Sequence, residues 1–215
     1  MDIHKTIIYL GYFFLGLNTI LFFQSYRVYS VAFKIFCFYL LYCSIIQILT
    51  VYFKYEFKSN LFLSHYYFIG QFVLLSLFYR KIILKKRWKD LISVLSVIIL
   101  IYLSINFIRE PSLYNTFYLT EIVLCSLPLV FYSILYFTES FGVENKQFLI
   151  INSGVFLYLL CSTLIFASGN LMPNLPKDVN RLVWIFNVSF YLIYQILVFI
   201  EWYKNFRKQE ITNTP

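Results

Sequence analysis

The chain has 215 residues, of which 60% are apolar, 22% aromatic and only 13% charged, and its formal net charge is +8. Soluble domains are about 45–50% apolar and about 25% charged, so the composition excludes an ordinary water-soluble globular protein. The apolar residues form continuous runs and do not alternate with polar ones, which also excludes a membrane β-barrel. The sequence therefore indicates a helical membrane protein.

Seven apolar runs have the length of a membrane-spanning helix, which needs about 20 residues. We predict spans over residues 6–26, 31–53, 61–79, 91–108, 116–137, 148–169 and 181–203. The connections between them are short, and no internal repeat is visible. The predicted fold is an all-α, seven-transmembrane-helix bundle that forms a single polytopic domain over residues 1–215.

A basic segment, RKIILKKRWKD from Arg80 to Asp90, separates the third and fourth spans. Positive charge next to membrane spans is retained on the cytoplasmic side. This segment therefore predicts that the N-terminus lies outside and the C-terminus in the cytoplasm. Basic residues beside spans also favour contact with anionic lipid over nucleic-acid binding. The residues predicted to contact anionic lipid are Arg80, Lys81, Lys85, Lys86, Arg87 and Lys89.

Two ionisable residues lie well inside predicted spans, His65 in the third and Glu121 in the fifth. Ionisable groups in a span are costly and usually face the interior of the bundle. Gln47 and Asn187 fall at a similar depth, so we predict a polar pocket of these four residues in the outer part of the bundle. Two interpretations remain open: a ligand or proton site, or a structural hydrogen bond between helices worth about 1 kcal/mol.

Small or polar residues recur at seven-residue spacing in two spans, a pattern that lets helices approach closely. These predicted packing residues are Gly11 and Asn18 in the first span and Gly154, Cys161 and Ser168 in the sixth. Near the inner end of the last span, we expect Glu201 to form an interfacial ion pair with Lys204.

The sequence lacks the motifs of common membrane and soluble enzymes. It contains two histidines, too few for a zinc site built on several of them, and its four cysteines lie inside predicted spans without metal-ligand spacing. No GxSxG, phosphate-binding loop or dinucleotide-binding glycine pattern occurs. These absences disfavour an enzyme, and we predict no cofactor and no metal.

Several segments resemble a group of seven-helix inner-membrane proteins of Bacteroidota. The segments are HYYFIGQFVLLSLFY from His65 to Tyr79, Thr120-Glu121, Ile151 to Gly154 with Tyr158, and Trp184 to Asn187 with Tyr194. They span about two thirds of the chain. The resemblance implies a bacterial inner membrane and one seven-helix domain, and it carries no catalytic residues.

The function that these features favour is a sensory or receptor-like membrane module. It would bind a small or lipophilic ligand in the outer half of the bundle and signal to an inner partner, either a membrane protein or a cytoplasmic one. The first alternative is a small transporter or proton-coupled permease. The second is a structural subunit of a larger membrane complex, and the sequence does not determine the oligomeric state.

Overall fold

The computed structural model describes residues 3–27, 29–57, 60–143, 146–167 and 176–207. Every regular element in these ranges is helical, which confirms the predicted all-α class. The long helices are α1 (Ile3–Gln24), α2 (Val31–Phe57), α3 (Phe62–Ile82), α4 (Lys86–Arg109), α5 (Leu119–Ser140), α6 (Leu149–Ala167) and α7 (Lys177–Glu201). Two short elements are the 3-10 helix η1 (Pro111–Asn115) and the π-helical turn η3 (Trp202–Phe206).

Seven helices in the described ranges are long and apolar enough to cross a membrane, as the sequence predicts. A helix suits a lipid environment because it satisfies its backbone N–H and C=O groups internally. Large apolar side chains are also exposed around the bundle, on surfaces that suit contact with lipid. On α4 these include Val94, Ile98, Ile101 and Ile105.

The main difference from the predicted boundaries lies at the basic segment. We expected a loop from Arg80 to Asp90, but α3 continues through Ile82 and α4 begins at Lys86, which leaves residues 83–85 as the connection. Lysine and arginine are good helix formers and can extend their charged groups toward water from a helix end. The basic residues therefore occupy the ends of two helices, except Lys85, which lies in the connection between them.

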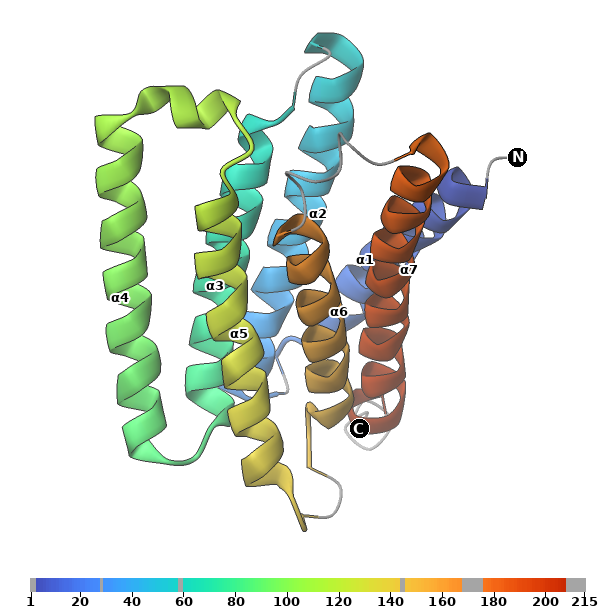
Figure 1. The fold of residues 1–215 in the computed structure, drawn as a ribbon. Coiled ribbons are helices and arrows are strands. Elements are labelled where there is room, and N and C mark those ends of the chain that lie inside the picture. The colour runs from blue at the N-terminus through green and yellow to red at the C-terminus, as the bar shows by residue number, and fades with distance from the viewer. Residues whose placement is uncertain (1–2, 28, 58–59, 144–145, 168–175, 208–215) are drawn as a thin grey trace.

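Contacts between neighbouring helices close six of them into a ring, and Figure 1 shows α4 at one edge of the bundle. Contacts link α1 to α2, α2 to α3, α3 to α5, α5 to α6, α6 to α7, and α7 back to α1. Helix α4 stands outside this ring against α3 and α5, and it returns the chain to the opposite end so that α5 runs parallel to α3. We call the end with the α3–α4 connection the basic end.

Aromatic side chains fill the ring near the basic end. Phe22 and Phe33 stack with ring centroids 5.0 Å apart, and Phe206 lies 4.7 Å from Phe33. Phe148 lies 5.3 Å from both Phe78 and Phe206. All five side chains are almost completely buried. This inner aromatic cluster closes the ring at the basic end because it joins residues of α1, α2, α3 and η3 with the residue before α6.

Glu201 corrects one expectation from the sequence. It is fully buried, and its carboxylate accepts hydrogen bonds from the backbone N–H groups of Phe148 (2.7 Å) and Ile150 (2.9 Å) at the start of α6. The first N–H groups of a helix have no partner within the helix and favour a negative charge. Glu201 thus caps α6 from α7 instead of pairing with Lys204 at the interface.

A second carboxylate makes a similar contact at the basic end. Glu139, near the end of α5, accepts hydrogen bonds from the backbone N–H groups of Leu84 (2.6 Å) and Lys85 (3.1 Å) just before α4. The Glu139 carbonyl accepts a hydrogen bond from Lys146. Desolvation lowers the pKa of Lys146, and the charge of Glu139 opposes this shift. These contacts fix the start of α4 and tie Lys146, which precedes α6, to the end of α5.

Alanine substitutions at Gly154 and Gly16 should change the stability of the protein in opposite directions, because α6 and α7 approach closely at Gly154 whereas Gly16 has free space around it. A Cβ atom at Gly154 would lie 2.8 Å from Cδ2 of Tyr194, whereas a Cβ atom at Gly16 meets nothing within 4 Å. Gly154→Ala should therefore cost about 1–3 kcal/mol through overpacking. The matched control Gly16→Ala should stabilise α1 by up to about 1 kcal/mol. Thermal unfolding midpoints in detergent test this, and equal midpoints would contradict the packing.

Removal of the Glu201 carboxylate should destabilise the protein. Glu201→Ala would leave the buried Phe148 N–H without its acceptor, at a residue whose backbone has the unfavourable φ of 68°. We expect a loss of about 2–3 kcal/mol, typical of a lost hydrogen bond to a charged group. The control is Glu56→Ala, at an exposed glutamate. Equal unfolding free energies of the two variants would show that the cap contributes nothing.

Candidate functional site

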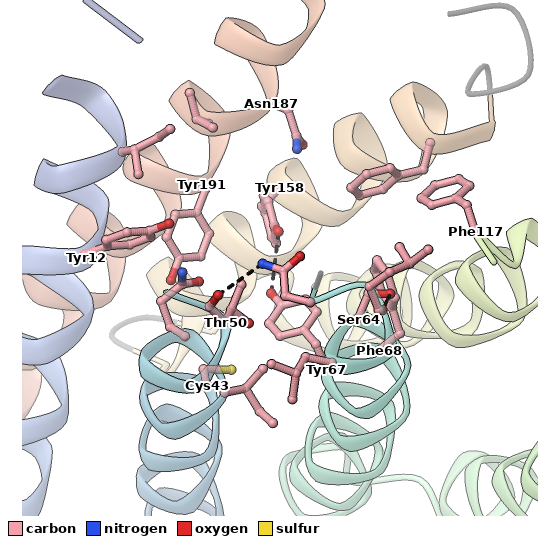
Figure 2. A pocket seen from close by; sticks show the side chains of 18 residues that line it. Tyr12, Cys43, Thr50, Ser64, Tyr67, Phe68, Phe117, Tyr158, Asn187 and Tyr191 are labelled. Carbon is pink, nitrogen blue, oxygen red and sulfur yellow. Dashed lines mark hydrogen bonds between the residues drawn. The ribbon is translucent and has the colours of Figure 1, made fainter. Parts of the chain in front are cut away.

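A cavity of about 340 Å³ lies inside the helix ring, away from the basic end. Figure 2 shows its lining, with Tyr12, Tyr67, Tyr158 and Tyr191 around the space and Asn187 pointing into it. We call this space the central cavity. Its volume lies near the lower end of the range of about 300–1,000 Å³ that is typical of small-molecule sites.

Helical spacing explains how α2 and α7 contribute to the central cavity. Cys43, Gln47 and Thr50 lie at positions i, i+4 and i+7 of α2, which places them on one face. Asn187 and Tyr191 have the i, i+4 spacing on α7. Gln47 and Asn187, predicted from the sequence to lie at similar depth, both line this cavity.

On the side of the central cavity that faces the basic end, a buried amide connects two tyrosines. Gln71 donates hydrogen bonds through Nε2 to the hydroxyl oxygens of Tyr39 (3.2 Å) and Tyr67 (3.3 Å). The hydroxyl of Tyr67 lies 3.5 Å from that of Tyr158. These contacts join α2, α3 and α6, and they hold the phenol groups that form the floor of the cavity.

The amide of Asn187 is arranged differently. Its Oδ1 atom is buried but has no hydrogen-bond partner among the described residues. The side chain points into the central cavity (Figure 2). A buried carbonyl oxygen without a partner costs free energy. The cavity therefore presents an acceptor that a bound molecule could satisfy.

His65 and Glu121 form a buried pair. His65 Nδ1 lies 2.5 Å from Glu121 Oε2, and the two side chains are 3% and 1% exposed. At this distance the two atoms form a hydrogen bond. Glu121 lies in the first turn of α5, where the helix dipole favours a carboxylate.

The surroundings of this pair are largely aromatic. The imidazole of His65 packs edge-on against Phe107 of α4 (5.3 Å between centroids) and Tyr114 of η1 (6.1 Å). The other two polar atoms of the pair, His65 Nε2 and Glu121 Oε1, are buried and have no hydrogen-bond partner within the described ranges. The pair thus lies between α3 and α5, beneath α4 and η1.

The structure separates the four residues of the predicted pocket into two pairs. Gln47 and Asn187 line the central cavity, whereas His65 and Glu121 do not. Similar depth along the spans was predicted from residue counts, but depth does not define the direction in which a side chain points. On α3, Ser64 faces the cavity while its neighbour His65 faces α5. Whether any of the four binds a ligand stays a prediction.

The predicted packing residues have different environments. A Cβ atom at Gly11 would lie 3.1 Å from Cδ1 of Tyr191, so α1 and α7 approach closely there. Asn18 is fully buried and donates hydrogen bonds to the backbone carbonyl (2.8 Å) and the side-chain oxygen (3.0 Å) of Gln195. Gly154 packs against α7, Cys161 is half-buried, and Ser168 lies outside the described residues.

The basic residues predicted to contact lipid are at the surface. Arg80, Lys81, Lys85, Lys86 and Arg87 are exposed. Lys89 is partly buried. Such positions are compatible with contact to anionic headgroups, which stays a prediction.

Sequence reasoning missed much of the cavity wall. Tyr12, Tyr67 and Tyr158 were not singled out as lining residues, because tyrosine is abundant in this chain and its positions alone do not mark a site. One available signal was the i, i+4 spacing of Tyr67 and Gln71, which places a phenol and an amide on one face of α3. Phe117, in the η1–α5 connection, also lines the cavity and could not be predicted from helix periodicity.

Metal binding finds no support in the described part of the chain, where no cluster of three or more His, Cys, Asp or Glu side chains occurs. No protein-family model, no curated protein and no solved structure matches the chain. The function must therefore be inferred from the central cavity and the His65–Glu121 pair.

The buried pair predicts strong thermodynamic coupling between His65 and Glu121. Replacing either residue by leucine leaves a buried polar partner alone, whereas the double replacement removes both. We expect the double variant to be more stable than the sum of the single effects predicts, with a coupling energy of about 1–3 kcal/mol. Unfolding of His65→Leu, Glu121→Leu and the double variant in detergent measures it. Purely additive effects would contradict the contact.

Proposed function

We propose that this protein is a receptor-like module of a bacterial inner membrane. It binds a small or lipophilic ligand in the central cavity and signals to a partner at the basic end. The observation that carries the proposal is the cavity itself, whose mostly apolar wall bears a few polar groups, the usual makeup of a small-molecule site.

The proposed orientation follows from the basic residues. Positive charge beside spans is retained in the cytoplasm, so the basic end would face inward and the N-terminus outward. Of the 18 lysines and arginines, most belong to the segments that this topology puts inside. The central cavity would then lie toward the outer side, where an extracellular or lipid-borne molecule could reach it.

Helix α7 supports a route for the signal. It carries Asn187 and Tyr191 in the wall of the cavity and ends at Glu201, which caps α6 near the basic end. A π-helical turn, an element frequent at functional sites, follows directly at Trp202–Phe206. A ligand that shifts α7 would therefore act on the contacts that fix the start of α6.

In this proposal the His65–Glu121 pair has a positioning role. Phe117 lies just before α5, which carries Glu121 in its first turn, and Phe68 follows His65 by nearly one turn of α3; both phenylalanines line the cavity. By joining α3 to α5, the pair keeps these two aromatic side chains in the cavity wall.

A small transporter is the second candidate, and the order of helices in the ring favours it. The segments α1–α2–α3 and α5–α6–α7 run in the same sense around the cavity, with α4 as the connection. Paired units related by an axis along the membrane normal occur in some transporters. In that case the inner aromatic cluster would be a closed gate, and the protein in liposomes would carry out flux.

Filling the cavity should abolish ligand binding. Val188 lines the cavity, whereas Ile193 on the same helix is 41% exposed on the outside. We expect wild-type protein, purified in mild detergent from bacterial membranes, to retain a small molecule that mass spectrometry detects. Val188→Trp should retain at least about tenfold less, a difference of one decade in affinity, and the control Ile193→Trp should behave as wild type.

Two outcomes would contradict this function. If all three proteins carry the same small molecules, the cavity does not bind them. If none carries any but a protein co-purifies in stoichiometric amount with each, the chain is a structural subunit of a complex.

A further inference from the structure

The wall of the central cavity carries no formal charge. Among the residues of the described part of the chain that line it, none is Asp, Glu, Lys, Arg or His. The buried His65 and Glu121 side chains pair with each other across 2.5 Å and do not line the cavity. A charged molecule in this space would lose part of its water without gaining a counter-ion, which is unfavourable.

The polar groups of the wall nevertheless require hydrogen bonds. Asn187 Oδ1 is buried without a partner among the described residues, and as a carbonyl oxygen it can only accept. Asn60 already donates to the Thr50 carbonyl, and the hydroxyl of Tyr67 already accepts from Gln71, which lies outside the wall. The unmet requirement in the cavity is therefore a donor from the bound molecule.

Aromatic side chains define the remaining surface. Tyr158 packs against Tyr191 with centroids 5.5 Å apart, and Phe117 lies 5.8 Å from Phe166 at the other side. Together with the aliphatic wall residues they offer an apolar surface for a flat or compact body.

From these features we infer that the central cavity selects an uncharged, amphipathic molecule with an apolar body and at least one hydrogen-bond donor, such as an alcohol or an amide. This inference rests on the proposed ligand-binding role and adds the chemical class of the ligand. The donor bonds to Asn187 Oδ1, and the apolar body packs between the tyrosine and phenylalanine side chains.

Three probes with one aromatic body and different charge test the inference. They are naphthylmethanol, naphthoate and naphthylmethylammonium, which are neutral, negative and positive at neutral pH. Binding is measured by fluorescence with the full chain in nanodiscs, and Val188→Trp protein supplies the background of partition into lipid. We expect naphthylmethanol to bind wild type at least about tenfold more tightly than either charged probe, one decade in affinity.

Adding one charge to the wall should change this preference. Gln47 lines the cavity, so Gln47→Glu, or Asn187→Asp if the first variant does not fold, places a carboxylate there with almost no change in shape. Either variant should bind naphthylmethylammonium about tenfold more tightly than wild type does. Gln24→Glu makes the same chemical change at an exposed position and should leave all three affinities unchanged.

The outcomes separate the two claims. If a charged probe binds wild type as tightly as naphthylmethanol, the ligand-binding role stands and the neutral class is wrong. Tight ammonium binding to wild type would mean that the tyrosines hold a cation through their π faces. If no probe binds above the Val188→Trp background and Gln47→Glu changes nothing, the binding role fails and the inference fails with it.

Discussion

Closure of the helix ring between α1 and α7 is the constraint on which the rest of the structure depends. The amide of Asn18 donates to both the carbonyl and the side-chain oxygen of Gln195, and all of these groups are buried. In a lipid environment such groups have few other partners, so the contact favours this one arrangement of the first and last helices. Gly11 lets Tyr191 approach on the same face. Without this closure the space between the helices would open to lipid.

The interior of the closed ring differs in chemistry between the basic end and the opposite end. Phenylalanines fill it near the basic end, and they need no polar partners. Beside them, in the last turn of α3 and the first turn of α6, Tyr79 donates to Asn152, whose amide donates to the Ser133 carbonyl, so that α3, α5 and α6 are joined. Farther from the basic end lies the central cavity. A cavity persists there because bulky tyrosines, fixed by hydrogen bonds such as Gln71 to Tyr67, cannot collapse into it.

The sequence is sufficient to predict the class of fold and the number of helices, because both follow from composition and from the length of apolar runs. It also identifies His65 and Glu121, since ionisable groups in a span are rare and must find a partner. It does not predict which residues share a cavity, because the ring order of the helices determines the direction of each face. Ser64 and His65 are neighbours in the chain but face different spaces for this reason.

Glu201 illustrates the same limit at a single residue. A glutamate near Lys204 at the end of an apolar run has the pattern of an interfacial ion pair, yet its carboxylate is buried against the start of α6. Only the contact between α6 and α7 brings the unpaired N–H groups of one helix to the end of the other. Because α7 also forms part of the cavity wall, one helix connects the predicted ligand site with the buried cap near the basic end. That physical continuity is why we favour a receptor-like role over a purely structural one.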